Sequence, residues 1–224
     1  MDNFFLYGGL GFMFFKWVHF LAGITWIGVL YYFNFIQGEW FKEIEDQVKG
    51  TAVRTLVPRA LWWFRWGAMF TFLSGVAMLL VQGHPDFSLN YNVYIYTGAL
   101  MGTFMFLNVW LVIWPAQQIV IASSESVANG GEANPEAGNA LARAGLASRT
   151  NTLFSIPMLF FMGAARGLGA DSTSQAALIA STVIILLIEA NAIKGKMGPM
   201  ASVKGVIHCG LALTVVLYCS HCFI

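Results

Sequence analysis

The chain contains very few charged residues. Asp, Glu, Lys and Arg make up 10% of its 224 residues, against about a quarter in a typical soluble domain. Hydrophobic residues make up 58%. This composition excludes a soluble domain, because such a surface could not face water. The net charge of +1 gives nothing to attract nucleic acid, so nucleic acid is excluded as a partner. We therefore expect an integral membrane protein whose main surroundings are a lipid bilayer.

Cysteine is also scarce. The three cysteines are Cys209, Cys219 and Cys222, too few for a disulfide framework to hold the fold together. Cys219 and Cys222 have His221 between them, and thiolates with an imidazole suit copper or zinc. We expect His84 on the same side of the membrane. The alternative is that Cys219 and Cys222 form a disulfide with each other.

A cleavable signal peptide is missing as well. The opening MDNFFLYGG has neither a basic segment nor a small-residue cleavage site, so the first apolar segment is expected to stay. Six segments are long and apolar enough to cross about 30 Å of hydrocarbon as helices. They lie near residues 12–36, 60–81, 93–114, 152–168, 175–193 and 201–222. The predicted fold class is an all-α integral membrane protein, in which residues 1–224 form one bundle of about six transmembrane helices.

Two segments are too polar to span. Residues 39–57 carry apolar side chains at helical spacing opposite a charged face, which is typical of an amphipathic helix on the inner leaflet. These apolar residues are Trp40, Phe41, Ile44 and Val48. Residues 123–148 are small, polar and interrupted by Gly and Pro. This composition predicts a flexible cytoplasmic loop, with one short helix at its end.

Basic residues indicate the orientation, since cytoplasmic loops are enriched in Lys and Arg. Three of the predicted connections between spans carry Lys42, Lys49, Arg54, Arg59, Arg143, Arg149, Lys194 and Lys196. The loops on the other side offer little besides Arg166. We therefore expect both chain ends outside the cytoplasm of a bacterium, with the bundle in its inner membrane.

Two histidines within the predicted spans are candidate haem ligands, because ionisable groups inside a membrane are costly and often functional. His19 has Gly23 one turn and Trp26 two turns further along the same helix face. A small residue beside a histidine would let haem b approach the helix, with His19 as an axial ligand. His208 is the second candidate. The alternative for each is a hydrogen bond to a neighbouring helix. One haem shared by both is disfavoured, because the two lie about 10 Å apart along the membrane normal.

Polar residues also gather in the predicted cytoplasmic half of the bundle. They are Asn34, Asn108, Arg149, Asn151, Glu189 and His208, and together they could line one pocket. Arg149 and Arg65 could bind carboxylates such as haem propionates through paired hydrogen bonds. Glu189 and His208 could relay protons for a quinone. The alternative is a hydrogen-bonded network that only joins helix ends.

Three segments in register carry a family resemblance. They are FKWVHFLAGITWIGVLYYFNF, WLVIWPAQQ and SRTNTLFSIPMLFFMGAARG, and WWFRWGAMFTFLSG fits more loosely. From about residue 12 to 168 the chain resembles the membrane domain of the urate hydroxylase family, also called the urate oxidase N-terminal domain. Full-length members join this domain to a cytochrome c domain and are credited with urate oxidation through the respiratory chain. The resemblance therefore implies a membrane redox role.

The chain departs from that family at several points. Its 224 residues contain no Cys-x-x-Cys-His motif, so a cytochrome c would be a separate protein. Trp62, Gly67 and Thr150 stand where the family has a histidine, an acidic residue and a histidine. Of the family's membrane histidines only His19 carries over. These differences leave open whether the chain is itself an enzyme.

The sequence thus favours a membrane-embedded redox or electron-transfer subunit of a larger complex. It would bind haem b or a quinone and pass electrons to other membrane subunits or a separate cytochrome c. The cofactor-binding residues under this hypothesis are His19, Gly23, Trp26, Asn108, Arg149, Glu189 and His208. Two alternatives stay open: an accessory subunit without a cofactor that packs against a membrane oxidoreductase, and a urate-oxidising membrane enzyme.

Overall fold

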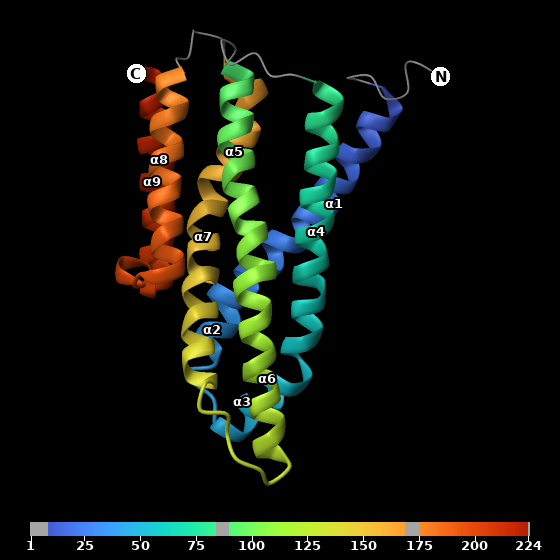
Figure 1. Cartoon of the computed structure of the whole chain (residues 1–224), viewed down its shortest axis with the longest axis vertical. Helices are drawn as coiled ribbons and strands as arrows, with labels where there is room; N and C mark the ends of the chain where they lie inside the picture. Colours follow the sequence, from blue (N-terminus) through green and yellow to red (C-terminus); the bar gives the residue numbers. More distant parts are fainter. Residues whose placement is uncertain (1–8, 84–89, 169–174, 224) are drawn as a thin grey trace.

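A computed structural model describes residues 9–83, 90–168 and 175–223 of the chain. Within these residues the fold is all-helical, and the long helices run side by side as one bundle (Figure 1). The elements are α1 (Leu10–Tyr31), the π-helix η1 (Tyr32–Gln37), α2 (Gly38–Trp40), α3 (Asp46–Thr55), α4 (Val57–Gln82), α5 (Asn90–Leu107), the π-helix η2 (Asn108–Ile113), α6 (Trp114–Ala128), α7 (Ala137–Gly167), α8 (Gln175–Lys194), the 3₁₀-helix η3 (Gly198–Ala201) and α9 (Val203–Phe223). The start of α1 and the end of α9 lie at the same end of the bundle.

Five helical stretches among the described residues are long and apolar enough to cross a membrane. They are Leu10–Trp40, Val57–Gln82, Tyr91–Ala128, Gln175–Lys194 and Val203–Phe223. The predicted count of about six is therefore not matched, because the segment near 152–168 is not among the five. That segment belongs to α7, which packs against α5, α6, α8 and α9. Since α7 packs against four other helices, it can bury polar side chains such as Asn151, Thr152 and Ser155, and these side chains lower its hydropathy.

The prediction of a flexible loop over 123–148 is wrong for most of its length. The helix formed by α5, η2 and α6 continues to Ala128, and α7 already begins at Ala137. Alanine is the best helix former, and the start of α7 is rich in it. Ala140 and Ala144 are buried against Ala116 of α6. The small side chains therefore allow two helices to pack closely, and only the short connection between them is non-helical.

Residues 39–57 do not form one amphipathic helix either. α2 ends at Trp40, five non-helical residues follow, and α3 begins at Asp46. α3 packs against α4 and α6 and buries Ala52, whereas Val48 stays exposed.

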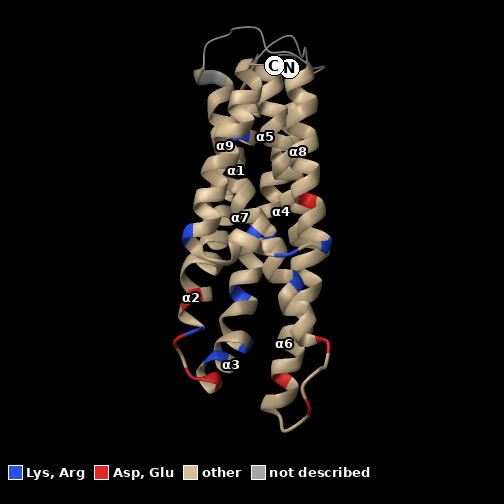
Figure 2. Ribbon diagram, turned by 90° about the vertical axis from the view of Figure 1, so that its left-hand side faces the viewer, with Lys and Arg blue, Asp and Glu red and all other residues tan. Residues whose placement is uncertain are grey.

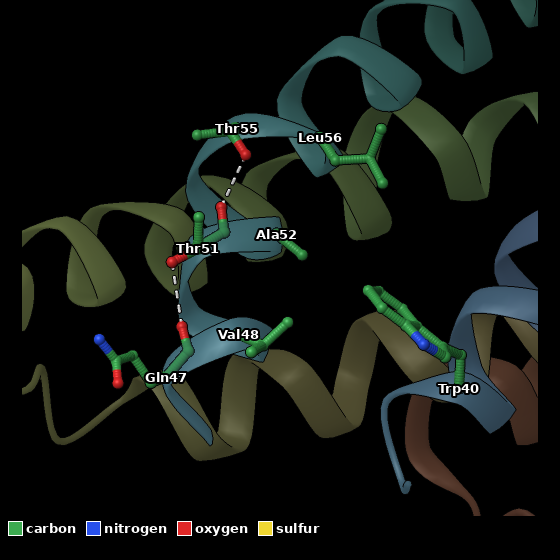
Figure 3. A pocket seen from close by; sticks show the side chains of 7 residues that line it. All are labelled: Trp40, Gln47, Val48, Thr51, Ala52, Thr55 and Leu56. Carbon is green, nitrogen blue, oxygen red and sulfur yellow. Dashed lines mark hydrogen bonds between the residues drawn. The ribbon is translucent and has the colours of Figure 1, made fainter. Parts of the chain in front are cut away.

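An open groove of about 410 Å³ lies between the Trp40 ring and the exposed face of α3 (Figure 3). Its lining residues are Trp40, Gln47, Val48, Thr51, Ala52, Thr55 and Leu56.

Glycine permits the closest approach between α1 and α4. A Cβ atom at Gly67 would lie 3.1 Å from the backbone nitrogen of Trp26 and 3.3 Å from the carbonyl oxygen of Ala22. The two backbones therefore nearly touch at this crossing. Trp26, Leu30 and Phe64 are buried around it, so the crossing is part of the main hydrophobic core.

Two π-helical segments interrupt the long helices. η2 directly precedes Trp114 and Pro115 at the start of α6. Proline has no backbone N–H, and its ring crowds the carbonyl four residues earlier, so a wider helical turn before Pro115 relieves that contact. π-helical turns are rare and frequent at functional sites. Each of the two segments contains a buried asparagine, Asn34 in η1 and Asn108 in η2.

Charged side chains gather in one half of the bundle. Figure 2 shows most Lys, Arg, Asp and Glu residues in the half away from the start of α1 and the end of α9. Among the described residues, few charged side chains lie in the half that holds these helix ends. The charged residues of the bundle are thus distributed asymmetrically along its long axis.

Candidate functional site

A network of buried amide and carboxyl groups joins α5–η2, α7 and α8. The Asn108 Nδ2 group donates to Asn151 Oδ1 at 3.0 Å and to Glu189 Oε2 at 3.1 Å. Asn151 Nδ2 donates in turn to the Met105 carbonyl oxygen at 2.9 Å. Asn108, Asn151 and Glu189 expose only 2%, 0% and 6% of their surfaces. The structure thus brings together three of the residues that the sequence placed in one polar group.

The positions of these three side chains follow from the helices that carry them. Asn108 begins η2, which contacts α7. Asn151 lies near the middle of α7, and Glu189 lies in α8. Among the residues that the structure describes, Glu189 is the only buried acidic side chain. A carboxyl group in this setting can hold or release a proton while the Asn108 amide that bonds to it keeps its position through Asn151. This network is the candidate functional site.

Asn34 reaches α7 at a different point. Its Nδ2 group donates to Ser148 Oγ at 2.8 Å and to the Leu30 carbonyl oxygen at 2.9 Å. One turn earlier in the chain, the Tyr31 hydroxyl lies 2.9 Å from Ser155 Oγ. These bonds tie the end of the first long helix to α7. Asn34 therefore borders the candidate site without a hydrogen bond to Asn108, Asn151 or Glu189.

Arg149 forms an ion pair with Glu39 of α2. It exposes only 8% of its surface, and its Nη2 atom lies 3.8 Å from Glu39 Oε1. Glu39 also binds the Lys42 ammonium group at 2.8 Å, so Arg149 shares its partner. The second terminal nitrogen, Nη1, is buried without a hydrogen bond, as is Gln37 Oε1. The hydrogen bonds among the described residues thus join Asn108 to Asn151 and Glu189, while Arg149 pairs with Glu39.

His19 is bound to α4. Its Nδ1 atom donates to the Thr71 carbonyl oxygen at 2.8 Å and lies 3.3 Å from Ser74 Oγ. Gly75 lies against the imidazole, since a Cβ atom there would be 3.2 Å from His19 Cε1. Gly23 faces Thr71 at van der Waals distance. The space beside Gly23 is thus occupied by α4, and the alternative of a hydrogen bond to a neighbouring helix is what the geometry shows for His19.

His208 is exposed on α9, and α9 packs mainly on α7 and η3. α1, which carries His19, packs mainly on α4. The two histidines therefore do not converge, and a haem b held between them does not fit this fold. Trp26 is buried at the crossing of α1 and α4, so it is not placed to contact a haem bound by His19. In the described part of the chain no group of three or more His, Cys, Asp or Glu residues is placed to hold a metal ion.

His221 is buried in the core and contacts side chains of other helices. Its Nε2 atom lies 3.2 Å from Ser181 Oγ and 3.5 Å from Thr97 Oγ1. Its ring packs edge-on against Tyr94 and Phe161, with ring centroids 5.3 Å apart in each case. Sequence reasoning missed this interhelical role, because it paired His221 with its neighbours in the chain. The cysteines are free and Cys222 is exposed, while His84 lies outside the described residues.

The comparisons with known proteins give one match. Residues 85–194 match the model of a family described as urate oxidase, N-terminal. No curated protein and no solved structure shows significant similarity to the chain. The matched residues include Asn108, Asn151 and Glu189 but neither His19 nor His208. The family match thus covers the whole of the buried network and excludes both predicted haem ligands.

Proposed function

We propose that this chain, whose residues 85–194 match the urate oxidase N-terminal family, is a membrane-embedded redox subunit of a larger complex. The observation that carries the proposal is the buried Glu189 carboxyl group, held by Asn108 between α5 and α8. An ionisable side chain inside a transmembrane bundle is costly, so it is expected to serve a function. In this proposal that function is to hold and deliver a proton.

A quinone is the redox partner that best uses such a group. Reduction of a quinone to a quinol takes up two electrons and two protons, so a quinone in the bilayer needs a proton donor within reach. Glu189 would supply one proton, and Asn108 would hold the carboxyl group in place. The Asn151 side chain fixes Asn108, and the Met105 carbonyl fixes Asn151. The two electrons would come from other membrane subunits, and water at the charged end of the bundle would supply the second proton and reprotonate Glu189. A separate cytochrome c would take electrons only in a later step, when the quinol is reoxidised and releases both protons.

Binding of haem b by His19 is a secondary part of the proposal. His19 donates from Nδ1 to Thr71, which leaves Nε2 as the ring nitrogen that could bind iron. This tautomer is common in metal-binding histidines, where the other ring nitrogen bonds to a carbonyl or carboxylate. A haem bound by His19 would have to lie on the outer side of α1 and α4 and take its other contacts from a partner subunit.

The membrane placement is also part of the proposal. The five apolar stretches and α7 would cross the bacterial inner membrane together. The half rich in charged residues (Figure 2) would face the cytoplasm, since basic residues are enriched on that side. Both chain ends would then lie outside.

Two other functions each have one observation in their favour. The family's description names urate oxidase, which favours urate as the ultimate electron donor or as the substrate of a urate-oxidising membrane enzyme. The exposed aromatic residues along α4 favour an accessory subunit that packs against a membrane oxidoreductase. They are Trp62, Trp63, Trp66 and Phe70. Neither observation requires the buried carboxyl group, which is why we prefer the redox subunit.

Binding of a soluble quinone tests the proposal. The full chain would be purified in detergent, and decylubiquinone binding would be followed by quenching of tryptophan fluorescence. We expect wild type to bind and Glu189→Leu to bind about tenfold more weakly, because a hydrogen bond to an ionisable group is lost. Glu125→Leu is the matched control, since Glu125 is exposed on α6, and it should bind like wild type.

A second variant separates binding from proton delivery. Glu189→Gln keeps the size and a hydrogen-bond donor, so it should bind decylubiquinone normally. In membranes that contain the whole complex it should nevertheless lose urate-dependent reduction of decylubiquinone. The absorbance spectrum and an organic extract of the native protein complete the test. A protein with no haem absorbance, no extractable quinone and no decylubiquinone binding would overturn the redox proposal.

A further inference from the structure

Arg65 is a cation without a carboxylate partner in the apolar helix α4. Its guanidinium carbon lies 3.4 Å from the centre of the Trp114 ring and 5.7 Å from that of Trp110. The ion pairs formed among the described residues join Glu39 to Lys42 and Arg149, so neither involves Arg65. Stacking on aromatic rings offsets only part of the cost of moving a guanidinium out of water. The site therefore lacks a negative charge.

Two buried hydrogen-bond donors at the same place also lack an acceptor. The Nε atom of Arg65 and the Nε1 atom of Trp110 are both buried and form no hydrogen bond. Buried polar groups without partners are uncommon, and each one calls for an explanation. Here both groups are donors on side chains that contact each other. An anion with several acceptor oxygens would neutralise the guanidinium, and it would satisfy the two buried donors once the Arg65 and Trp110 side chains turn toward it.

The surroundings of Arg65 indicate which anion this is. Pro58, Arg59, Trp62 and Trp63 line an open groove of about 410 Å³ at the start of α4. Trp62 and Trp63 expose 48% and 58% of their surfaces. Exposed tryptophans near the end of a membrane helix are typical of the headgroup region. Arg65 lies only about 9 Å further along the helix axis than Arg59, so its guanidinium is within reach of that region.

We infer that Arg65 and Trp110 bind the phosphate group of an anionic phospholipid, on the face where α4 meets α6. The guanidinium is planar and can donate two parallel hydrogen bonds to a phosphate, and the indole N–H adds a third. The lipid chains would run along the exposed side of α4, past Trp66 and Phe70. The inference needs the membrane placement but not the redox role, because none of its residues belongs to the Glu189 network.

Native mass spectrometry of the full chain in detergent tests this site. Phosphatidylglycerol or phosphatidylcholine would be added, and the bound lipid counted for wild type, Arg65→Gln, Trp110→Phe and Arg143→Gln. Wild type should prefer phosphatidylglycerol, and Arg65→Gln should bind it about tenfold more weakly. Trp110→Phe keeps one aromatic ring beside Arg65 but loses the N–H and part of the ring surface, so its binding should fall less than that of Arg65→Gln. Arg143 is exposed on α7, and Arg143→Gln should match wild type.

Two further measurements identify the ligand and protect against misfolding. Inorganic phosphate should displace phosphatidylglycerol from wild type if the phosphate group is what binds. If inorganic phosphate alone is retained through Arg65, while phosphatidylglycerol is not, the lipid assignment is overturned. Arg65→Lys keeps the charge but not the planar donor pair, so a weaker lipid complex with unchanged circular dichroism would support the geometry. Equal retention of phosphatidylglycerol by wild type and Arg65→Gln would refute the inference.

Discussion

The hydrogen bonds of Asn108 should stabilise the fold by an amount that a double-mutant cycle can measure. Asn108→Leu removes the donor that serves both Asn151 Oδ1 and Glu189 Oε2. Side-chain hydrogen bonds between membrane helices are worth about 0.6 kcal/mol on average and at most about 1.7 kcal/mol. With two bonds lost, the free energy of unfolding should fall by about 1–3 kcal/mol.

The second arm of the cycle is Glu189→Leu, which removes only the bond to Asn108. Each single variant loses the Asn108–Glu189 bond, and the double variant loses the same bond only once. The combined loss should therefore be smaller than the sum of the single losses, by about 0.6–1.7 kcal/mol. Unfolding would be followed by circular dichroism during titration of detergent micelles with sodium dodecyl sulfate. Single losses that add to within about 0.3 kcal/mol would show that the Asn108–Glu189 bond does not stabilise the fold.

Two further predictions concern helix packing and orientation. Gly67→Ala should be less stable than Gly28→Ala by about 1–3 kcal/mol in the same titration. A Cβ atom at Gly67 would lie 3.1 Å from the α1 backbone, whereas one at Gly28 would have no neighbour within 4 Å. Equal stability of the two variants would contradict the close crossing of α1 and α4. Cys222 is exposed, so a membrane-impermeant maleimide should label intact spheroplasts through it and should label Cys222→Ser much less. Labelling only after the membrane is permeabilised would reverse the proposed orientation.

The presence of long apolar helices and their approximate residue ranges were predictable because the apolar runs in the sequence are long. The predicted segments near 60–81 and 175–193 fall within α4 and α8 to within a few residues at each end. The wrong predictions concern segments whose composition is compatible with two different structures. Glycine and alanine in 123–148 suggested a flexible chain, but the same small side chains let α7 pack against α6 through Ala140 and Ala144. Composition alone cannot distinguish these cases, since the partner helix is not local in sequence.

The candidate site was predictable only in part. Asn108, Asn151 and Glu189 could be grouped because all three lie within or next to the predicted spans, toward the cytoplasmic side. Arg149 lies at a similar depth but points toward Glu39, because residues two apart on a helix face directions about 200° apart. Gly23 beside His19 showed the same ambiguity. A glycine next to a histidine suits a haem or a second helix equally well, and only the position of Thr71 on α4 decides between them.

The polar residues of α7 explain both the missing span and the site. Ser148, Asn151 and Ser155 lie within about 60° of one another around the helix axis. They bind Asn34 in η1, Asn108 in η2 and Tyr31 in α1. A helix that binds its neighbours through polar side chains has a low hydropathy, so a search for apolar spans passes over it. A membrane helix can have low hydropathy only where other helices satisfy its polar groups. In such a bundle, the helix with the lowest hydropathy is therefore the one expected to hold the polar site.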